Sequence, residues 1–260
     1  LGGTATGYAN GGETGTYTYP SGAFSGSGGF ASFDVGVSLT AGGDIGLAAA
    51  IDAPNAEVAF DAGGTITPTA AGDLTAERFR LVNGDWNQVG PGLATFAAND
   101  FVLAGTPETS TRSFLRAAGG SGTAADPYQI TDIFGLQGLD SAALLGASLV
   151  LANDIDATGT TAWNFRSFDS TFQGFDPIGE GAAQFTGTFD GAGFAIDGLT
   201  MNRITGGLFD DPQGATIAKL GMTALDITGS AAAGAVAGSS DNVAYSDITL
   251  GGTVRGDFFL

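Results

Sequence analysis

The chain has 260 residues, with 8 Lys or Arg, 27 Asp or Glu and no His, which gives a formal net charge of −19. This balance argues against a nucleic-acid or anionic-membrane partner, because such contacts need clustered basic residues. Cys is also absent, so disulfides, thiolate metal sites and His- or Cys-based catalysis are excluded. The 45 glycines would suit corners between strands, and 19 phenylalanines can supply a core.

Two features of the chain bear on its cellular context. It contains no apolar run of the roughly 18 residues that a membrane span needs. It begins at Leu1 without a signal peptide and ends on Phe258-Phe259-Leu260 without a polar capping unit. We therefore expect a fragment of a longer protein.

Residues 1–41 interleave Gly, Ser and Thr with aromatic residues. This composition predicts short β rungs joined by glycine turns, and an exposed aromatic ladder that binds sugars is the alternative. Residues 42–96 are more regular, with Ile45 and Ile66 standing 21 residues apart in similar segments. That repeat predicts stacked β-helix rungs, and Asn83-Gly84 predicts a turn before Trp86.

Residues 97–176 form the least regular region, in which we expect β-helix rungs with loop excursions. Apolar residues at helix-like spacings between 130 and 145 predict one short helix of two to three turns. Residues 148–151 then return to a strand pattern.

The loop over residues 158–176 is polar and aromatic, and loops on a stiff scaffold are where binding residues concentrate. It predicts a ligand site formed by Trp163, Phe165, Arg166 and Asp169. The alternative is that the aromatic side chains fold back over the scaffold. Just upstream, Asp154 and Asp156 stand two apart and would share one face of a strand, which makes a structural Ca²⁺ ion a second hypothesis.

Residues 177–260 carry the strongest repeat. Small or apolar residues alternate through 185–200, and the turn residues 190–193 predict a corner between two strands. Ile196 matches Ile217 at a distance of 21 residues, and Ile217 matches Tyr245 at 28. Repeats of this length with strand-type alternation predict an all-β fold, a parallel β-helix.

The segment FTGTFDGAGFAIDGLT (185–200), followed by GGLFDDPQGATIAKLGM (206–222), resembles the GLUG repeats of large bacterial surface adhesins. The upstream segments GGDIGLAAAID, ERFRLVNGDWNQV and SFLRAAGGSGTAADPYQITDIFGLQGL are similar to the regions that precede such repeats in filamentous-haemagglutinin-type, two-partner-secreted proteins. The resemblance covers about residues 42 to 256, and it departs from the family at Asp210, where Gly is usual.

This resemblance implies a right-handed parallel β-helix, GLUG-like over 177–260, in a secreted or cell-surface bacterial protein. It also implies export by a partner outer-membrane transporter. The expected function is a stiff stalk that presents binding loops to a glycan or protein receptor on a host or neighbouring cell. We expect no catalysis, since the many acidic residues form pairs at any spacing. The alternatives are a polysaccharide-processing β-helix enzyme and a self-assembling structural filament.

Overall fold

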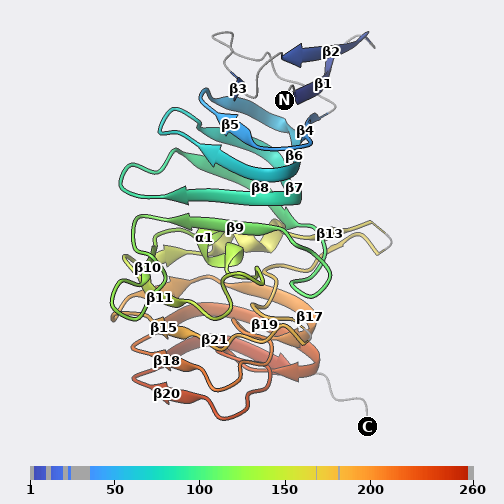
Figure 1. Cartoon of the computed structure of the whole chain (residues 1–260). Coiled ribbons are helices and arrows are strands. Elements are labelled where there is room, and N and C mark those ends of the chain that lie inside the picture. The colour runs from blue at the N-terminus through green and yellow to red at the C-terminus, as the bar shows by residue number, and fades with distance from the viewer. Residues whose placement is uncertain are drawn as a thin grey trace.

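The chain folds into a tall stack of β-strands that runs from the N-terminal to the C-terminal part of the chain (Figure 1). This computed structural model describes the backbone of residues 3–9, 13–19 and 23–24, and residues 36–256 apart from 168 and 181. The fold is all-β, as the sequence predicted, with one short α-helix and one 3-10 helix among the described residues.

The strands and helices follow the chain in this order: β1(Gly3–Ala9), β2(Glu13–Tyr19), β3(Ala23–Phe24), β4(Val37–Ala41), β5(Ile45–Leu47), β6(Ile51–Pro68), β7(Leu74–Val89), β8(Phe96–Leu103), β9(Ser113–Ala117), β10(Tyr128–Ile130), α1(Ile133–Gly138), β11(Ser148–Leu151), β12(Ile155–Asp156), the 3-10 helix η1(Thr158–Ala162), β13(Phe165–Arg166), β14(Thr171–Phe172), β15(Thr188–Asp190), β16(Ala195–Asp197), β17(Thr200–Gly206), β18(Thr216–Ala218), β19(Gly221–Ala233), β20(Ala244–Ser246) and β21(Thr249–Gly256).

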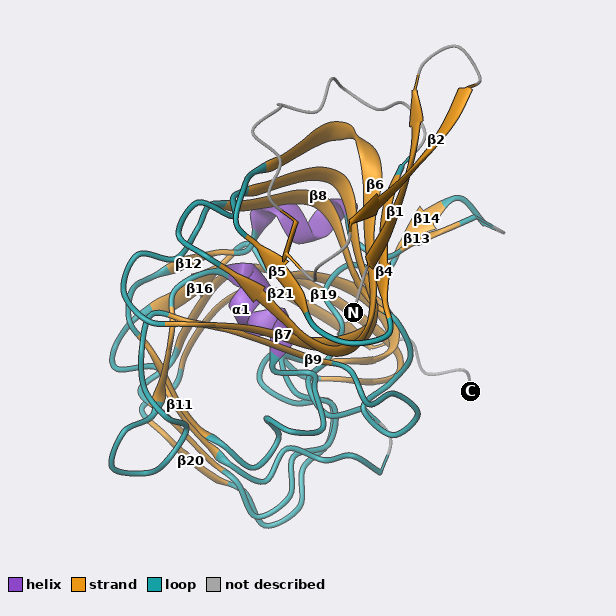
Figure 2. Ribbon diagram, turned by 45° about the horizontal axis from the view of Figure 1, so that its top comes forward, coloured by secondary structure: helices purple, strands orange, loops and turns teal. Residues whose placement is uncertain are grey.

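Most strands pair in parallel with a strand further along the chain, so that each layer lies on the one before it. One sheet has the order β2-β1-β4-β6-β5-β3, and β7 pairs with β6 of this sheet and with β8 and β9. The other two large sheets are β10-β11-β15-β18-β20 and β12-β16-β19-β17, with β21 on β19. In Figure 2, β11 and β20 of the second sheet lie over one another near one corner of the molecule.

The first strands depart from the stacked rungs expected for residues 1–41. β1 pairs antiparallel with β2, and its other edge pairs antiparallel with β4. Only three residues separate β1 from β2, whereas a parallel pair needs a connection of a dozen or more. The side chains of the predicted aromatic ladder lie outside the described residues.

Long strands turn corners without breaking. β6 and β7 are 18 and 16 residues long, and their mutual register shifts between Phe60 and Thr65. Asn83-Gly84 lies inside β7, where Gly84 takes a φ of 101°. The dipeptide therefore bends a continuing strand, and Trp86 beyond it is buried in the core.

The predicted register is confirmed in the N-terminal sheet and wrong in part of the C-terminal repeats. Ile45 pairs with Ile66 and Ile217 with Tyr245, as expected. Ile196, however, pairs with Met222, and Ile217 pairs with Phe189. Ile196 and Ile217 belong to different sheets that carry the same alternating pattern, which is why they match in sequence at 21 residues. Within each sheet, the paired residues are 26 or 28 apart.

The corner at residues 190–193 is confirmed, because it joins β15 of one sheet to β16 of another. Ala192 and Gly193 both take positive φ values, and the Ala192 N–H donates to the Asp190 carboxylate at 2.8 Å. The predicted helix is α1, which is shorter than two turns. Asp132 caps it by accepting a hydrogen bond from the Gly135 N–H at 2.8 Å.

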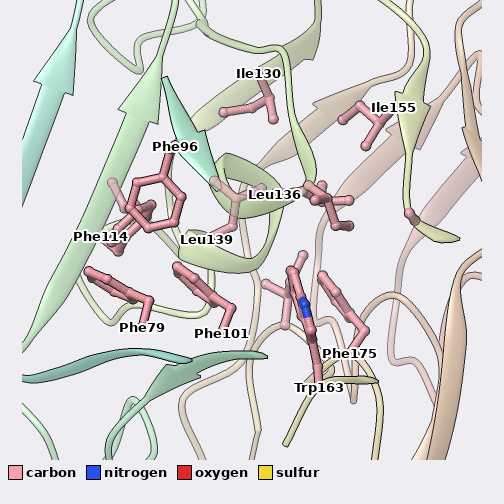
Figure 3. Packing of buried hydrophobic residues seen from close by; sticks show 14 of the residues in the cluster. Phe79, Phe96, Phe101, Phe114, Ile130, Leu136, Leu139, Ile155, Trp163 and Phe175 are labelled. Atoms are coloured by element: carbon pink, nitrogen blue, oxygen red, sulfur yellow. The ribbon is translucent and has the colours of Figure 1, made fainter. Parts of the chain in front are cut away.

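The core runs through the middle of the stack and is richest in aromatic residues around α1. In Figure 3, Phe79, Phe96, Phe101 and Phe114 lie on one side of Leu136, and Trp163 and Phe175 continue the cluster. Phe79 and Phe101 stack at 5.1 Å between centroids with an interplanar angle of 12°. These contacts tie the N-terminal sheet to the C-terminal layers. None of the described helices is long and apolar enough to cross a membrane.

Candidate functional site

A short antiparallel hairpin, β13–β14, projects sideways from the stack in Figure 1. Its base is Trp163, which is 1% exposed and packs against Phe101, Phe134 and Phe175. Immediately beyond Trp163, Asn164 takes a φ of 57°, which turns the chain outward, and its side-chain amide donates to the Gly174 carbonyl at 2.8 Å. The hairpin is therefore a projecting element on a rigid base.

The Asp100 carboxylate ties this hairpin to the sheet. Its Oδ1 accepts the Asn164 N–H at 2.7 Å, and its Oδ2 accepts Arg78 Nε at 2.8 Å. Asp100 is buried on β8 and Arg78 lies on β7, so one carboxylate joins two layers of the stack to a segment 64 residues later. A buried carboxylate with both oxygens engaged is held in one position.

Two adjoining open hollows of about 440 and 280 Å³, which we call the hairpin cleft, lie between the hairpin and strands β6 to β8. Both hollows are lined by Phe165, Arg78, Glu57 and Asp100. Phe172 lines the larger hollow. Further lining residues of the smaller hollow are Arg80, Arg166, Asn164 and Gln173.

Two exposed aromatic rings form one wall of the hairpin cleft. Phe165 and Phe172 are cross-strand partners that are 41% and 44% exposed. Their ring centroids are 5.1 Å apart and the rings are inclined by 53°. Together the two rings offer an exposed apolar surface to a ligand.

Arg78 interacts with two of the acidic side chains that line the cleft, Glu57 and Asp100. Its Nη1 is 3.7 Å from a Glu57 oxygen, in addition to the short bond to Asp100. Partial burial lowers the pKa of Arg78, but hydrogen bonding and attraction to Asp100 and Glu57 outweigh it and raise the pKa overall. This guanidinium is therefore a permanent cation.

The four predicted ligand residues do not all lie at one site in the structure. Phe165 and Arg166 line the hairpin cleft together. Asp169 lies at the hairpin tip, where its carboxylate accepts the Thr171 hydroxyl at 2.8 Å and is 3.4 Å from an Arg166 nitrogen. Trp163 lies in the core rather than at the cleft, and its role is to anchor the hairpin.

Sequence reasoning missed Arg78, Arg80, Asp100 and Phe172. A signal existed for the two arginines, because they flank buried Phe79 and must share the outer face of β7. No comparable signal existed for Asp100, whose partner Asn164 belongs to a distant excursion.

Asp154 and Asp156 do lie on one exposed side of the chain, two residues apart. Asp154 Oδ1 accepts the Ala195 N–H at 2.8 Å. Asp156 Oδ1 accepts the Thr158 hydroxyl and N–H, and these hydrogen bonds lower the pKa of Asp156. In the described part of the chain, no three acidic residues are grouped so that they could hold a metal ion. Both carboxylates thus have hydrogen-bond partners within the protein. The Ca²⁺ hypothesis stays a prediction.

A second polar cluster lies inside the molecule. Arg112 is 2% exposed, and its guanidinium donates to the carbonyls of Leu103, Ala104, Gly105 and Asp140 at 2.7–3.3 Å. These bonds fasten the loop between β8 and β9 to the turn after α1. No member of this group lines the hairpin cleft.

Asp140 is the acidic partner of Arg112, with 3.8 Å between Arg112 Nη2 and Oδ2. Burial raises the pKa of Asp140 to about 8, and the negative charge of Asp176 adds to the effect. The Gly179 N–H, which donates to Oδ1 at 3.0 Å, and Arg112 act in the opposite direction. A neutral carboxyl can act as a general acid, but this one is enclosed by the fold.

Asp140 makes stability depend on pH. Because its pKa is raised above the unfolded value of 3.8, its favourable contribution is complete below pH 3.8 and is lost as pH rises through about 8. Wild-type protein should lose unfolding free energy between about pH 5 and pH 8.5, as Asp140 becomes charged. In Asp140→Asn, whose side chain does not titrate, we expect this loss to be smaller by about 2 kcal/mol. Urea unfolding at the two pH values measures this. Asp226→Asn, at an exposed carboxylate, is the control, and an equal effect of both variants would contradict the assignment.

The hydrogen bond between Asp100 and Asn164 leads to a prediction about hydrogen exchange in the hairpin. Asp100→Ala removes the acceptor of the Asn164 N–H, so the hairpin loses its link to β8. We expect amide hydrogens of residues 164–173 to exchange at least about tenfold faster, because that link must break before they open. Glu77→Ala, which removes only an exposed bond to Asn99, is the control. Unchanged exchange in the hairpin would show that Trp163 alone holds it.

Comparison with known proteins gives one informative similarity. The chain is 32% identical over 205 residues to halomucin of Haloquadratum walsbyi (strain DSM 16790 / HBSQ001). The match covers 74% of this chain and 2% of halomucin, so the chain spans a small part of that relative's length. No protein-family model and no solved structure matches the chain.

Proposed function

We propose that this chain is a stiff, non-catalytic module of a large secreted or cell-surface protein of adhesin type, and that it binds its ligand in the hairpin cleft. The observation that carries the proposal is the projecting β13–β14 hairpin, which sets two exposed aromatic rings beside a row of arginines. The similarity to part of the much longer halomucin supports an extracellular or cell-surface location.

We further propose that the stacked layers form a right-handed parallel β-helix. The parallel pairing of β6 with β7 and β8, and of β15 with β18 and β20, supports this arrangement. In such a solenoid each layer buries its apolar face on its neighbours, so the scaffold resists bending. A stiff scaffold holds the hairpin cleft at a fixed distance from its attachment point, and repeated modules would add weak contacts as avidity.

The non-catalytic part of the proposal rests on where the carboxylates lie. The two carboxyl groups whose pKa is raised lie outside the cleft: Asp140 belongs to the interior cluster around Arg112, and half-buried Glu180 lies among other charged residues, including Asp176 and Arg203. In the cleft, Glu57 and Asp100 are engaged with Arg78. Export through a partner outer-membrane transporter stays a prediction from the family resemblance alone.

A glycan array tests the proposed function. Wild-type protein and the double variant Phe165→Ala/Phe172→Ala would be applied to the same array, with Ile204→Ala as a control for loss of an exposed apolar side chain elsewhere. We expect the double variant to lose the wild-type signals and the control to keep them. Equal binding by all three proteins would exclude the hairpin cleft as the site.

Self-association is a second candidate function, and one observation favours it. β20 and β21 each pair on one edge only among the described strands, and Tyr245, Leu250 and Val254 on them are 41–53% exposed. Unpaired edges with apolar side chains recruit further strands. Light scattering against concentration tests this: wild-type protein should form larger species, and Leu250→Lys should reduce them. A monomer at every concentration would contradict it.

A further inference from the structure

The cations of this protein are distributed unevenly. Of its eight basic residues, Arg112, Arg116 and Arg203 have side chains that are 14% exposed or less and are committed to internal bonds. Lys219, in the turn between β18 and β19, and Arg255, on β21, are exposed, and each pairs with one aspartate. The remaining three, Arg78, Arg80 and Arg166, all line the smaller hollow of the hairpin cleft.

This gathering is unusual in a chain with a net charge of −19, because randomly placed guanidinium groups would be diluted among 27 acidic residues. Two of the three already have acidic partners: Arg78 pairs with Asp100 and Glu57, and Arg166 with Asp169. Arg80 is exposed, and no acidic residue in the described part of the chain lies within ion-pair distance of it. It is the guanidinium that is left for a ligand's anionic group.

The other groups in the cleft suit a sugar. The rings of Phe165 and Phe172 can stack on the apolar face of a pyranose. Asn55 and Gln173 contribute side-chain amides that make no hydrogen bond to other described residues, so they can bind hydroxyl groups. Aromatic rings, amides and guanidinium groups across the two adjoining hollows of the cleft match the apolar face, the hydroxyls and the acidic group of one ligand.

We propose that the hairpin cleft binds an acidic glycan, with a carboxylate or sulfate of the sugar held by Arg80 beside Arg78 and Arg166, and the sugar ring packed against Phe165 and Phe172. This inference rests on the proposed function, since it names the ligand class of the same site. Arginine suits both groups because its planar donors match two anionic oxygens at once. The protein's overall negative charge repels polyanions at long range, but salt at 0.15 M screens it beyond about 8 Å while close contacts persist.

Calorimetric titration with four hexasaccharides tests the proposal: oligogalacturonate, its methyl ester, sulfated maltohexaose and maltohexaose. We expect the charged sugars to bind at least about tenfold more tightly than their neutral counterparts, the gain of roughly one charge-assisted hydrogen bond. Tighter binding of oligogalacturonate would identify a carboxylate as the ligand group, and tighter binding of sulfated maltohexaose a sulfate. Equal binding of charged and neutral sugars would overturn the proposal.

Arg80→Gln should remove most of the preference for charged sugars, whereas Arg255→Gln, which deletes the same charge at another exposed site, should keep affinity within about twofold. Hexaglutamate is the final arm. If it binds as tightly as oligogalacturonate and Phe165→Ala does not weaken it, the cleft attracts anions in general and the glycan assignment is wrong.

Rejection of the acidic ligand class can be distinguished from rejection of the hairpin cleft as the binding site. If array signals depend on Phe165 and Phe172 but come only from neutral glycans, the hairpin cleft remains the binding site and the acidic ligand class alone is rejected. If no variant of the hairpin changes binding of any glycan, the proposed site itself is rejected.

Discussion

Replacing Arg112 with methionine is expected to lower the free energy of unfolding by about 3–5 kcal/mol. Methionine keeps much of the apolar stem but removes the donor from the carbonyls of Leu103, Ala104, Gly105 and Asp140, and the bond to Asp140 is fully buried. Each unpaired buried acceptor costs about 1–3 kcal/mol before the surroundings relax. The loop between β8 and β9 should then detach from the turn that follows α1.

The measurement is urea unfolding of wild-type, Arg112→Met and Arg255→Met proteins. Arg255 also forms an ion pair, at 2.7 Å to Asp226, but both side chains are more than half exposed. Its replacement should change the unfolding free energy by less than about 0.5 kcal/mol, because exposed ion pairs add little. Similar losses for the two variants would mean that the bonds made by Arg112 do not hold the loop.

Replacing Trp163 with alanine should have a comparable effect, about 3–5 kcal/mol, because a large fully buried side chain leaves a cavity. The indole stacks between the N-terminal aromatic cluster and Phe175, as Figure 3 shows. Its loss should also release the base of the β13–β14 hairpin. Thermal unfolding together with hydrogen exchange of residues 164–173 would measure both consequences.

Two controls sharpen this prediction. Trp163→Phe should cost clearly less than Trp163→Ala, because it leaves a smaller cavity, keeps ring stacking and loses no hydrogen bond to the described residues. Phe165→Ala, two residues away but 41% exposed, should cost less than about 0.5 kcal/mol. If Phe165→Ala destabilised the protein as much as Trp163→Ala, the hairpin itself would carry the fold.

The sequence predicted the pairing well for β4 and β5. Both strands pair with β6 at an offset of 21 residues, so Ile45 lies beside Ile66. In the C-terminal repeats two different sheets carry the same alternation, so periodicity alone could not distinguish Ile217 from Met222 as the partner of Ile196. Asn83-Gly84 predicts a turn but lies in a bend within β7, because the positive φ of Gly84 suits a bend in a strand as well as a turn.

The candidate site was predictable in place but only partly in composition. The polar and aromatic loop does form the projecting hairpin, and Phe165 and Arg166 line the cleft. Trp163 could not be separated from them by composition, since its burial depends on Phe101 and Phe134, which come from earlier layers. Asp100 and Arg80 reach the same site because the stack brings their strands beside a hairpin that follows about 65 and 85 residues later in the chain.

The most direct test of the central claim is a hydrogen-exchange footprint of the full chain with the glycan that binds most tightly on the array. We predict protection confined to residues 164–173 and to the neighbouring parts of β6, β7 and β8, because these segments line the hairpin cleft. Protection confined to another surface, such as the exposed edge of β20 and β21, would contradict the assignment of the cleft as the binding site.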